Sequence, residues 1–256
     1  MILAGGFGTR ISEYTADLPK PMLTIGTKPI LWHIMKYYHT FGVKEFIICG
    51  GYKIEEINKF FHNYHFSIED YSYNFEEKQS IALTARAEDW RVHVINTGDN
   101  TMTGGRLKRI SDYIDENEDF FMTYGDGLSD VDLELLYQHH TKNRKKVTVT
   151  AVSPVARFGS LEVNPKSGAV TSFREKPPGD GLTINGGFFI LNKNALESVS
   201  CDQESWEEEP MQRLTKQGEL TAYQHTGFWQ PMDTKRDRDN LIEQWNNGDA
   251  KWKIWE

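Results

Sequence analysis

Short apolar runs that end in glycine alternate with segments of helical spacing along the first 150 residues. The runs 1–4 and 45–49 each stop at a pair of glycines. Between them, residues 28–42 place apolar side chains three and four positions apart, on one face of a helix. This order of strand, helix and strand predicts parallel strands joined by helical crossovers. Further strand candidates lie at 91–96, 120–124 and 147–152, and a further helix candidate at 54–64.

The segments after Val152 are shorter and carry turns between them. Apolar stretches at 159–163, 169–173 and 187–191 alternate with Pro and Gly, which favours antiparallel strands. No linker rich in Gly, Ser or Pro divides the chain, so we expect a single domain over residues 1–256. The expected fold class is α/β: a mixed, mostly parallel, Rossmann-like sheet flanked by helices, with a smaller antiparallel β portion.

Charge and composition argue against several classes of protein. The net charge of -8 disfavours a nucleic-acid partner, which normally meets a basic surface. No run approaches the roughly 18 apolar residues of a membrane helix, and the N-terminus lacks the pattern of a secretion signal. The distant Cys49 and Cys201 indicate neither a disulfide framework nor a zinc site. We therefore expect a cytoplasmic protein that binds no nucleic acid and no membrane.

The segment from Gly5 to Arg10 reads Gly-Gly-Phe-Gly-Thr-Arg directly after the first strand. It lacks the Lys-Ser/Thr ending of a P-loop and the third glycine of a dinucleotide fingerprint. Its glycine amides can instead turn toward a triphosphate, and the Arg10 guanidinium can grip phosphate oxygens. The alternative is a plain tight turn. The residues expected to bind a nucleotide here are Leu3, Ala4, Gly5, Gly6, Phe7, Gly8, Thr9 and Arg10.

Two lysines precede prolines. Lys20 lies between two prolines, and the restriction on residues before proline predicts an extended backbone that aims its ammonium at the phosphate loop. Lys176 is a candidate to hold a sugar phosphate, and the adjacent Glu175 to accept sugar hydroxyls. On composition alone, either lysine could equally be an exposed surface charge. Asn185 and Gly186, which open an apolar strand, are further candidates for the sugar side.

Asp126 and Asp233 are the candidate metal ligands. Asp126 stands between two glycines directly after the apolar strand 120–124, at the carboxyl edge of the sheet. Magnesium takes oxygen ligands, commonly one or two carboxylates with substrate phosphates and water. Asp233 follows a turn fixed by proline and precedes a charged helix, which makes it the best partner carboxylate. Each aspartate could alternatively be only a helix cap.

Several motifs occur together in one order along the chain: LAGGFGTR at 3–10, PKPM at 19–22, GDG at 125–127, FREKP at 173–177 and INGGFF at 184–189, with the late Asp233. Together they resemble the nucleotidyltransferase family of sugar-phosphate pyrophosphorylases. The resemblance implies a GT-A-like fold and the transfer of a nucleotidyl group to a sugar 1-phosphate with release of pyrophosphate. It also implies that Asp126 and Asp233 hold Mg²⁺. The residues expected to carry the catalysis are Arg10, Lys20, Asp126 and Lys176.

Further segments narrow the resemblance: KPILWHIMKYY at 28–38, TGDNTMTGGRLKR at 97–109, TYGDG at 123–127 and GFWQPMDT at 227–234. They are similar to the branch of the family that uses CTP and glucose 1-phosphate. The implied product is CDP-glucose, a precursor of deoxysugars in surface polysaccharide such as the lipopolysaccharide O-antigen. By this resemblance Thr101 and Arg106 meet the cytosine end of CTP, and Lys20 and Gly125 line the nucleotide.

The habit of this family also implies a homo-oligomer, with a hexamer as one candidate. The aromatic segment 64–75 and the tail 252–255 are candidate contacts, although both could pack on their own core. Segment 67–88 lacks periodicity and is expected to be a surface excursion or a subunit contact. Two alternatives to the CTP branch stay open: a thymidylyl- or uridylyltransferase with a different base pocket, and a non-catalytic module that binds nucleotide sugars.

Overall fold

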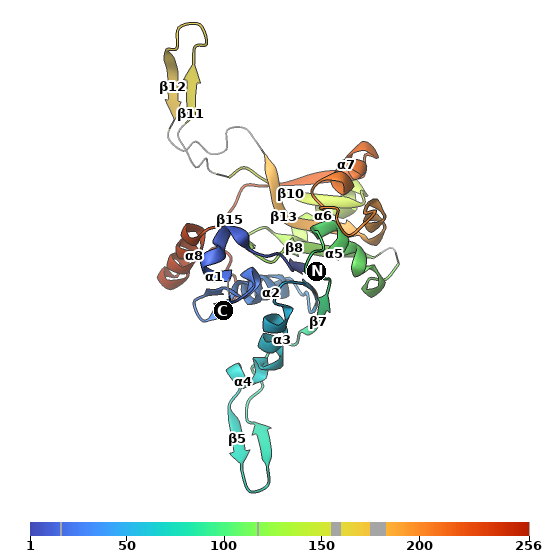
Figure 1. Ribbon diagram of the computed structural model, residues 1–256, viewed down its shortest axis with the longest axis vertical. Coiled ribbons are helices and arrows are strands. Elements are labelled where there is room, and N and C mark those ends of the chain that lie inside the picture. The colour runs from blue at the N-terminus through green and yellow to red at the C-terminus, as the bar shows by residue number, and fades with distance from the viewer. Residues whose placement is uncertain (16, 117, 155–159, 175–182, 256) are drawn as a thin grey trace.

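The computed structural model describes the chain except for residues 16, 117, 155–159, 175–182 and 256. A seven-stranded sheet forms its centre (Figure 1). In spatial order the strands are β14 (Leu220–His225), β10 (Val147–Val152), β13 (Ile184–Asn192), β8 (Asp119–Tyr124), β1 (Ile2–Ala4), β4 (Glu45–Gly50) and β7 (Arg91–Asn96). Every pair is parallel except the two that β13 makes with β10 and β8. The expected mixed, mostly parallel sheet is therefore confirmed.

Helices lie against both faces of this sheet. They are α1 (Ser12–Thr15), α2 (Ile30–Thr40), α3 (Ile54–His62), α4 (Tyr64–Ile68), α5 (Thr103–Arg109), α6 (Leu133–Asn143), α7 (Glu209–Lys216) and α8 (Lys235–Asn247). Short 3-10 turns are η1 (Thr9–Ile11), η2 (Lys20–Met22), η3 (Ser111–Tyr113) and η4 (Lys193–Ser198). Side chains alternate between the two faces of a strand. Ile2 and Ala4 accordingly pack in the core under α2 and α8, and Leu3 packs in the core under α5 and α7.

The C-terminal half differs from expectation in two ways. β14 joins the sheet beside β10, in register from Leu220 opposite Val147 to His225 opposite Val152. Its sequence, LTAYQH, contains no apolar run because it is a half-buried edge strand. α7 also forms there without having been expected, whereas α8 is the charged helix expected after Asp233. Each buries only a few side chains, so neither presents a long apolar stripe in the sequence.

The antiparallel portion consists of two-stranded ribbons: β2 (Thr24–Ile25) with β3 (Lys28–Pro29), β5 (Tyr71–Asn74) with β6 (Gln79–Ala82), β9 (Gly127–Ser129) with β15 (Trp229–Pro231), and β11 (Ser160–Val163) with β12 (Val170–Arg174). The β5–β6 and β11–β12 ribbons project from opposite ends of the molecule (Figure 1). The segment 67–88 thus contains a hairpin that stands clear of the body. None of the described helices is long and apolar enough to cross a membrane.

Candidate active site

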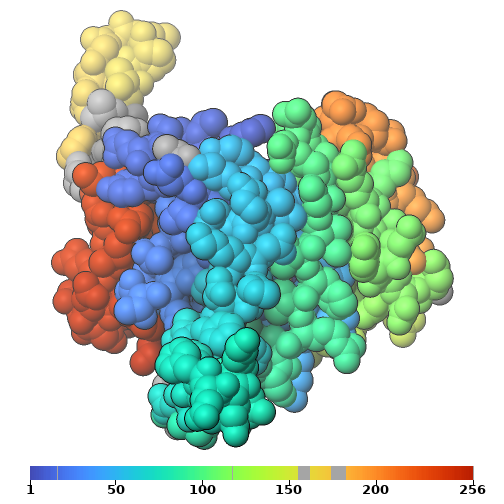
Figure 2. Space-filling model, turned by 60° about the horizontal axis from the view of Figure 1, so that its bottom comes forward, coloured from blue at the N-terminus to red at the C-terminus, as the bar shows by residue number. Residues whose placement is uncertain are grey.

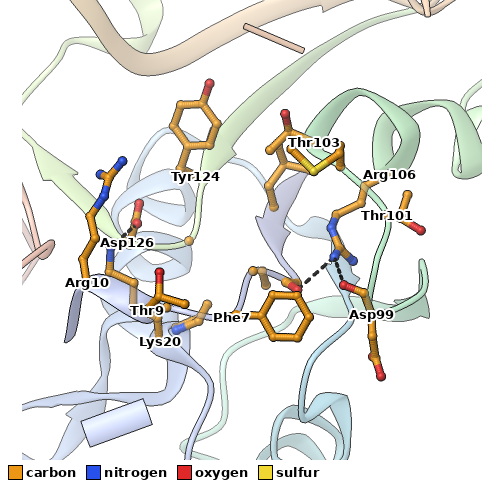
Figure 3. A pocket seen from close by; sticks show the side chains of 18 of the residues that line it. Phe7, Thr9, Arg10, Lys20, Asp99, Thr101, Thr103, Arg106, Tyr124 and Asp126 are labelled. Atoms are coloured by element: carbon orange, nitrogen blue, oxygen red, sulfur yellow. Dashed lines mark hydrogen bonds and ion pairs between the residues drawn. The ribbon is translucent and has the colours of Figure 1, made fainter. Parts of the chain in front are cut away.

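A cavity of about 520 Å³ opens at the carboxyl ends of β1 and β8. Open α/β sheets bind ligands at this edge. Figure 3 shows Arg10, Lys20 and Asp126 at one end of the cavity, and Thr101 and Arg106 at the other. The lining includes every residue expected to bind the nucleotide, namely Leu3 to Arg10, Lys20, Thr101, Arg106 and Gly125, together with both candidate metal ligands, Asp126 and Asp233.

The glycine loop turns sharply between β1 and η1. Gly8 has a φ of 63°, in the left-handed region, and a Cβ there would lie 2.8 Å from the Thr15 Cγ2. A side chain at this position would therefore meet both backbone strain and a clash. A Cβ at Gly6 would meet no heavy atom within 4 Å, so the loop leaves open space at that position. Phe7 is half exposed and packs against Tyr52, with ring centroids 5.3 Å apart.

Four charged side chains meet at the phosphate end of the cavity. The Lys20 Nζ lies 2.6 Å from the Asp126 Oδ2 and 2.7 Å from the Asp233 Oδ1. Arg10 donates to the other oxygen of Asp233 at 3.1 Å. Burial alone would lower the pKa of Lys20, but the two carboxylates outweigh it and raise that pKa above its usual value. Burial would likewise raise the pKa of Asp233, but Lys20 and then Arg10 lower it. Lys20 and Asp233 are therefore both ionised at neutral pH.

The β9–β15 ribbon brings the two aspartates together from positions 107 residues apart in the numbering. Asp126 immediately precedes β9, whose Gly127 is paired with Pro231 of β15. The Met232 amide then donates to the Asp126 carbonyl at 2.7 Å, which places Asp233 directly beside that turn. Sequence spacing could not reveal this pairing, because both strands have only three residues.

The expectation of an extended backbone at Lys20 was wrong. Ion pairs with Asp126 and Asp233 hold its side chain in position. It begins the 3-10 turn η2, while Pro19 before it is extended. The side chain is nearly buried, at 11% exposure, and its ammonium reaches the carboxylates directly. Proline on each side still limits the backbone, and the Leu23 amide closes the turn on the Lys20 carbonyl.

The two aspartates form a donor set that suits a divalent cation. They supply carboxylate oxygens at an accessible cavity edge, as Mg²⁺ prefers, and leave room for phosphate and water ligands. Among the described residues there is no cluster of three or more His, Cys, Asp or Glu side chains that would form a closed protein site. The Lys20 ammonium occupies the space between the carboxylates and stands there as their cation.

Arg106, at the opposite end, holds the cavity wall together. Its buried guanidinium donates to the carbonyls of Gly5, Gly50 and Asp99 and to the Thr97 hydroxyl, at 2.7 to 3.2 Å. A Cβ on Gly5 would lie 2.1 Å from this guanidinium. Glycine at the start of the loop is therefore required by the arginine. Both terminal nitrogens of the Arg106 guanidinium already donate to the protein. The expectation that Arg106 meets the cytosine end of CTP did not anticipate this.

The candidates for the sugar side are only partly described. Glu175 and Lys176 lie outside the described residues. Asn185 and Gly186 open β13 but do not line the cavity. Asn185 reaches it indirectly, because its Nδ2 donates to the hydroxyl of Tyr124 at 3.3 Å. The Gly186 carbonyl accepts a hydrogen bond of 2.6 Å from the indole of Trp229.

Six further lining residues were not among the sequence-derived candidates: Pro21, Asp99, Asn100, Met102, Thr103 and Tyr124. Tyr124 ends β8 directly before Gly125 and Asp126, so its position next to the Gly-Asp-Gly turn was the available signal. Its hydroxyl donates to Glu207. Burial and then the nearby Glu207 charge raise the pKa of Tyr124 well above its usual value, so the hydroxyl stays protonated.

Comparison with known proteins gives similarity over the whole chain. A family model described as nucleotidyl transferase matches residues 1–234. A protein of Salmonella typhimurium named glucose-1-phosphate cytidylyltransferase is 49% identical over 256 residues, which cover 100% of this chain and 99% of that protein. A Bacillus subtilis protein named probable glucose-1-phosphate cytidylyltransferase is 40% identical over the same length, with the same coverage. The crystal structure of HddC from Yersinia pseudotuberculosis superposes with a TM-score of 0.69 at 26% identity, covering 95% of this chain and 97% of that one.

Proposed function

The chain belongs to the nucleotidyl transferase family, and we propose that it transfers the cytidylyl group of CTP to α-D-glucose 1-phosphate, giving CDP-glucose and pyrophosphate. The observation that carries this proposal is 49% identity, over the whole length of both chains, to an enzyme named for that reaction. The site supports it independently, because a glycine loop, two carboxylates and two cationic side chains surround one cavity at the carboxyl edge of the sheet.

The reaction needs two anions to approach each other. A phosphate oxygen of glucose 1-phosphate attacks the α-phosphorus of CTP, forming one P–O bond while the bond to the β-phosphate breaks and pyrophosphate leaves. The second pKa of such a phosphate is about 6, so the nucleophile is already mostly dianionic at neutral pH. No general base is required. The protein must therefore supply alignment and positive charge.

We assign those tasks to residues at the phosphate end of the cavity. Arg10 and the amides of the glycine loop would hold the β- and γ-phosphates, where backbone N–H groups and a planar guanidinium suit phosphate oxygens. Lys20 would move from the carboxylates to the α-phosphate. Lys176 would anchor the incoming sugar phosphate, and Glu175 and Asn185 would receive sugar hydroxyls.

We propose Mg²⁺ as the cofactor, held by Asp126 and Asp233. A bound Mg²⁺ neutralises phosphate charge and orients the triphosphate. Asp126 is fixed for this by the turn between β8 and β9, and Asp233 by its position after β15. Because Arg10 also contacts Asp233, the same carboxylate would link the metal and the residue that grips the leaving group.

Thr101 and Arg106 support a pocket for cytosine at the far end of the cavity. Arg106 would shape it by fixing the loops that carry Gly5 and Asp99, and Thr101 is nearly buried beside it. A thymidylyl- or uridylyltransferase would keep the phosphate end and differ here. CTP is a cytoplasmic metabolite, so we expect the reaction to occur in the cytoplasm and to supply CDP-linked deoxysugars for surface polysaccharide.

The test is pyrophosphate release from glucose 1-phosphate with CTP, UTP, dTTP, ATP and GTP in turn, each with Mg²⁺ and with chelator. We expect activity with CTP that disappears on chelation and in Asp126→Asn. Asp132→Asn is the matched control, because Asp132 caps α6 and asparagine caps equally well. Preference for another base would move the enzyme to a sister branch, and silence with all five would favour the non-catalytic module.

We also propose that the enzyme is a homo-oligomer, with the hexamer as one candidate. The two ribbons that leave the body expose aromatic and aliphatic side chains, and a second copy of the chain is the simplest partner for them.

A further inference from the structure

Glu207 ends a chain of hydrogen bonds that runs along one wall of the cavity. One oxygen of its carboxylate accepts from the Tyr124 hydroxyl, and the other accepts from the Thr103 hydroxyl at 2.6 Å. Tyr124 and Thr103 both line the cavity, on the side away from Phe7 in Figure 3. A single side chain from the segment before α7 therefore fixes two cavity hydroxyls, one from β8 and one from α5.

The series of hydrogen bonds continues beyond both hydroxyls, and its donors all point the same way. The Asn185 Nδ2 donates to the Tyr124 oxygen at 3.3 Å, and the Trp206 amide donates to the Thr103 oxygen at 2.8 Å. Every proton in the series thus points toward the carboxylate of Glu207. The two hydroxyls donate to different oxygens, and a carboxylate provides two acceptor oxygens where an amide provides one. The two hydroxyls therefore use both the negative charge and the two equivalent oxygens of the Glu207 carboxylate.

The position of this carboxylate is fixed by its own segment. The amides of Met102 and Gly104, at the start of α5, donate to the carbonyls of Asp202 and Glu204 at 2.8 and 3.0 Å. Trp206 is fully buried in the core under α5 and α7. The backbone next to Glu207 is thus bonded to the helix that forms the cavity wall, which is how proteins hold a functional group to a narrow range of positions.

We propose that Glu207 is a positioning residue for the acceptor sugar: it orients the Tyr124 hydroxyl beside Asn185, whose Oδ1 the Gly187 amide already holds at 2.8 Å, to receive the hydroxyls of glucose 1-phosphate. The inference rests on the proposed function. Tyr124 is two residues from Asp126, and its hydroxyl bonds to Asn185 on β13. It therefore connects the reacting end of the cavity with the strand where the sugar is expected. Glu207 itself need not touch the substrate.

The test is Glu207→Gln, which keeps the size of the side chain but leaves it one acceptor oxygen. We expect the KM for glucose 1-phosphate to rise about tenfold, the size of one hydrogen bond to a charged group. The kcat should stay within about threefold and the KM for CTP within about twofold. Tyr124→Phe should behave in the same way, and the double variant should be no worse than either single one, because both remove the same bond. Glu208→Gln is the matched control, since Glu207 and Glu208 are both exposed but the bonds to Tyr124 and Thr103 are made by Glu207.

Three results would overturn the inference. Glu207→Gln could lower the Tm and leave the KM for glucose 1-phosphate unchanged, or it could lower only the kcat. The rise in KM in the double variant could also equal the product of the rises in the two single variants. Calorimetric titration of glucose 1-phosphate in the presence of a non-hydrolysable CTP analogue gives the same comparison without turnover. Wild-type protein that releases no pyrophosphate would defeat the proposed function. If the wild type is active and Glu207→Gln has the wild-type KM for glucose 1-phosphate, only this inference is refuted.

Discussion

Lys20 stands between the two carboxylates that are expected to hold the metal. Its ammonium contacts one oxygen of each, so a divalent cation arriving at Asp126 and Asp233 competes with it directly. Two neighbouring carboxylates without a cation repel each other, and the lysine relieves that repulsion in the ligand-free enzyme. Metal binding would release the ammonium toward the phosphates of the incoming nucleotide. The same contact thus predicts weak metal binding before nucleotide arrives.

Lys20→Met should strengthen metal binding to the ligand-free enzyme while it removes activity. Without the ammonium, the paired carboxylates gain more from a divalent cation, and we expect Mn²⁺ to bind at least about tenfold tighter, roughly one charge contact in a partly buried site. Electron paramagnetic resonance of free Mn²⁺ measures this without turnover. Lys44→Met, which removes an exposed ion pair with Asp89, is the control. Equal or weaker Mn²⁺ binding in Lys20→Met would contradict the competition.

The charged cluster should not set the pH dependence near neutrality. The lowered pKa of Asp233 contributes stability that is present above about pH 4 and is lost as the pH falls through its folded value. The raised pKa of Lys20 contributes stability that is present below about pH 10 and is lost as the pH rises through its folded value. Between these limits neither group changes its charge.

The activity should instead fall below about pH 6, where the sugar phosphate takes up its second proton. Glucose 1-phosphate with fluorine at carbon 2 is a more acidic phosphate, so its acid limb should move to lower pH. Profiles of kcat/KM for the two substrates measure the difference. An acid limb that stays at one pH for both substrates would indicate a titrating protein group.

At the scale of elements, α5 contains two glycines, Gly104 and Gly105, although glycine disfavours a helix. A Cβ on Gly104 would lie 2.7 Å from the Glu204 carbonyl, and a Cβ on Gly105 would lie 2.5 Å from the backbone of Asp202. Glycine in a helix costs about 1 kcal/mol relative to alanine. Here the cost is offset by close backbone contact, which lets the amides of α5 bond to the segment that carries Glu207.

Gly105→Ala should therefore lower the Tm, although the same change stabilises an ordinary helix. The methyl group must push α5 away from Asp202, and we expect a loss of about 1 to 3 kcal/mol, the usual range for overpacking. Gly127→Ala is the control, because a Cβ there meets no atom within 4 Å. Thermal unfolding followed by circular dichroism compares them. A Tm for Gly105→Ala at or above the wild-type value would show that the helix has room to move.

Sequence patterns predicted the elements that carry apolar runs and missed those that do not. The strands at 91–96 and 147–152 were predicted with the observed bounds, because Val and Ile occupy half of the first and every residue of the second is β-branched or apolar. β14 was missed because its sequence, LTAYQH, contains no apolar run. The segment that became β5 and β6 lacked a pattern because its side chains are mostly exposed on both faces.

The candidate site was predictable where glycine or proline marks a loop next to a strand. That signal pointed to the loop after β1, to Lys20 and to Asp126. It could not show that Lys20 bridges two aspartates, since this depends on a three-residue ribbon. That signal could not indicate Glu207 either, because no glycine or proline loop next to a strand marks this residue in the sequence. Only the fold brings Glu207 next to Tyr124.

At the scale of the whole molecule, the segment with the β5–β6 ribbon stands out from the body (Figure 2), and its aromatic side chains are exposed. Phe66, Tyr71, Tyr73 and Phe75 form a continuous row, with ring centroids 5.0, 5.9 and 6.3 Å apart. Phe66, Tyr73 and Phe75 are 56%, 55% and 87% exposed, so these three rings lie mostly outside the chain's own core. Exposed apolar ribbons favour pairing with other chains. The β11–β12 ribbon at the opposite end also exposes apolar side chains, including Phe173.

A chain with two such ribbons at opposite ends can make contacts that close into a ring, because each copy offers both surfaces. Phe75→Asp combined with Tyr73→Asp should therefore reduce the assembly to smaller species, since buried charge without a partner is costly at an apolar interface. Sedimentation velocity of wild type and variant measures the change, with Glu77→Gln at the same hairpin tip as the control. The cavity lies in the body at the edge of the sheet, away from this ribbon. A variant that keeps the wild-type sedimentation coefficient would exclude the ribbon as the contact, and a monomeric wild type would refute the oligomer itself.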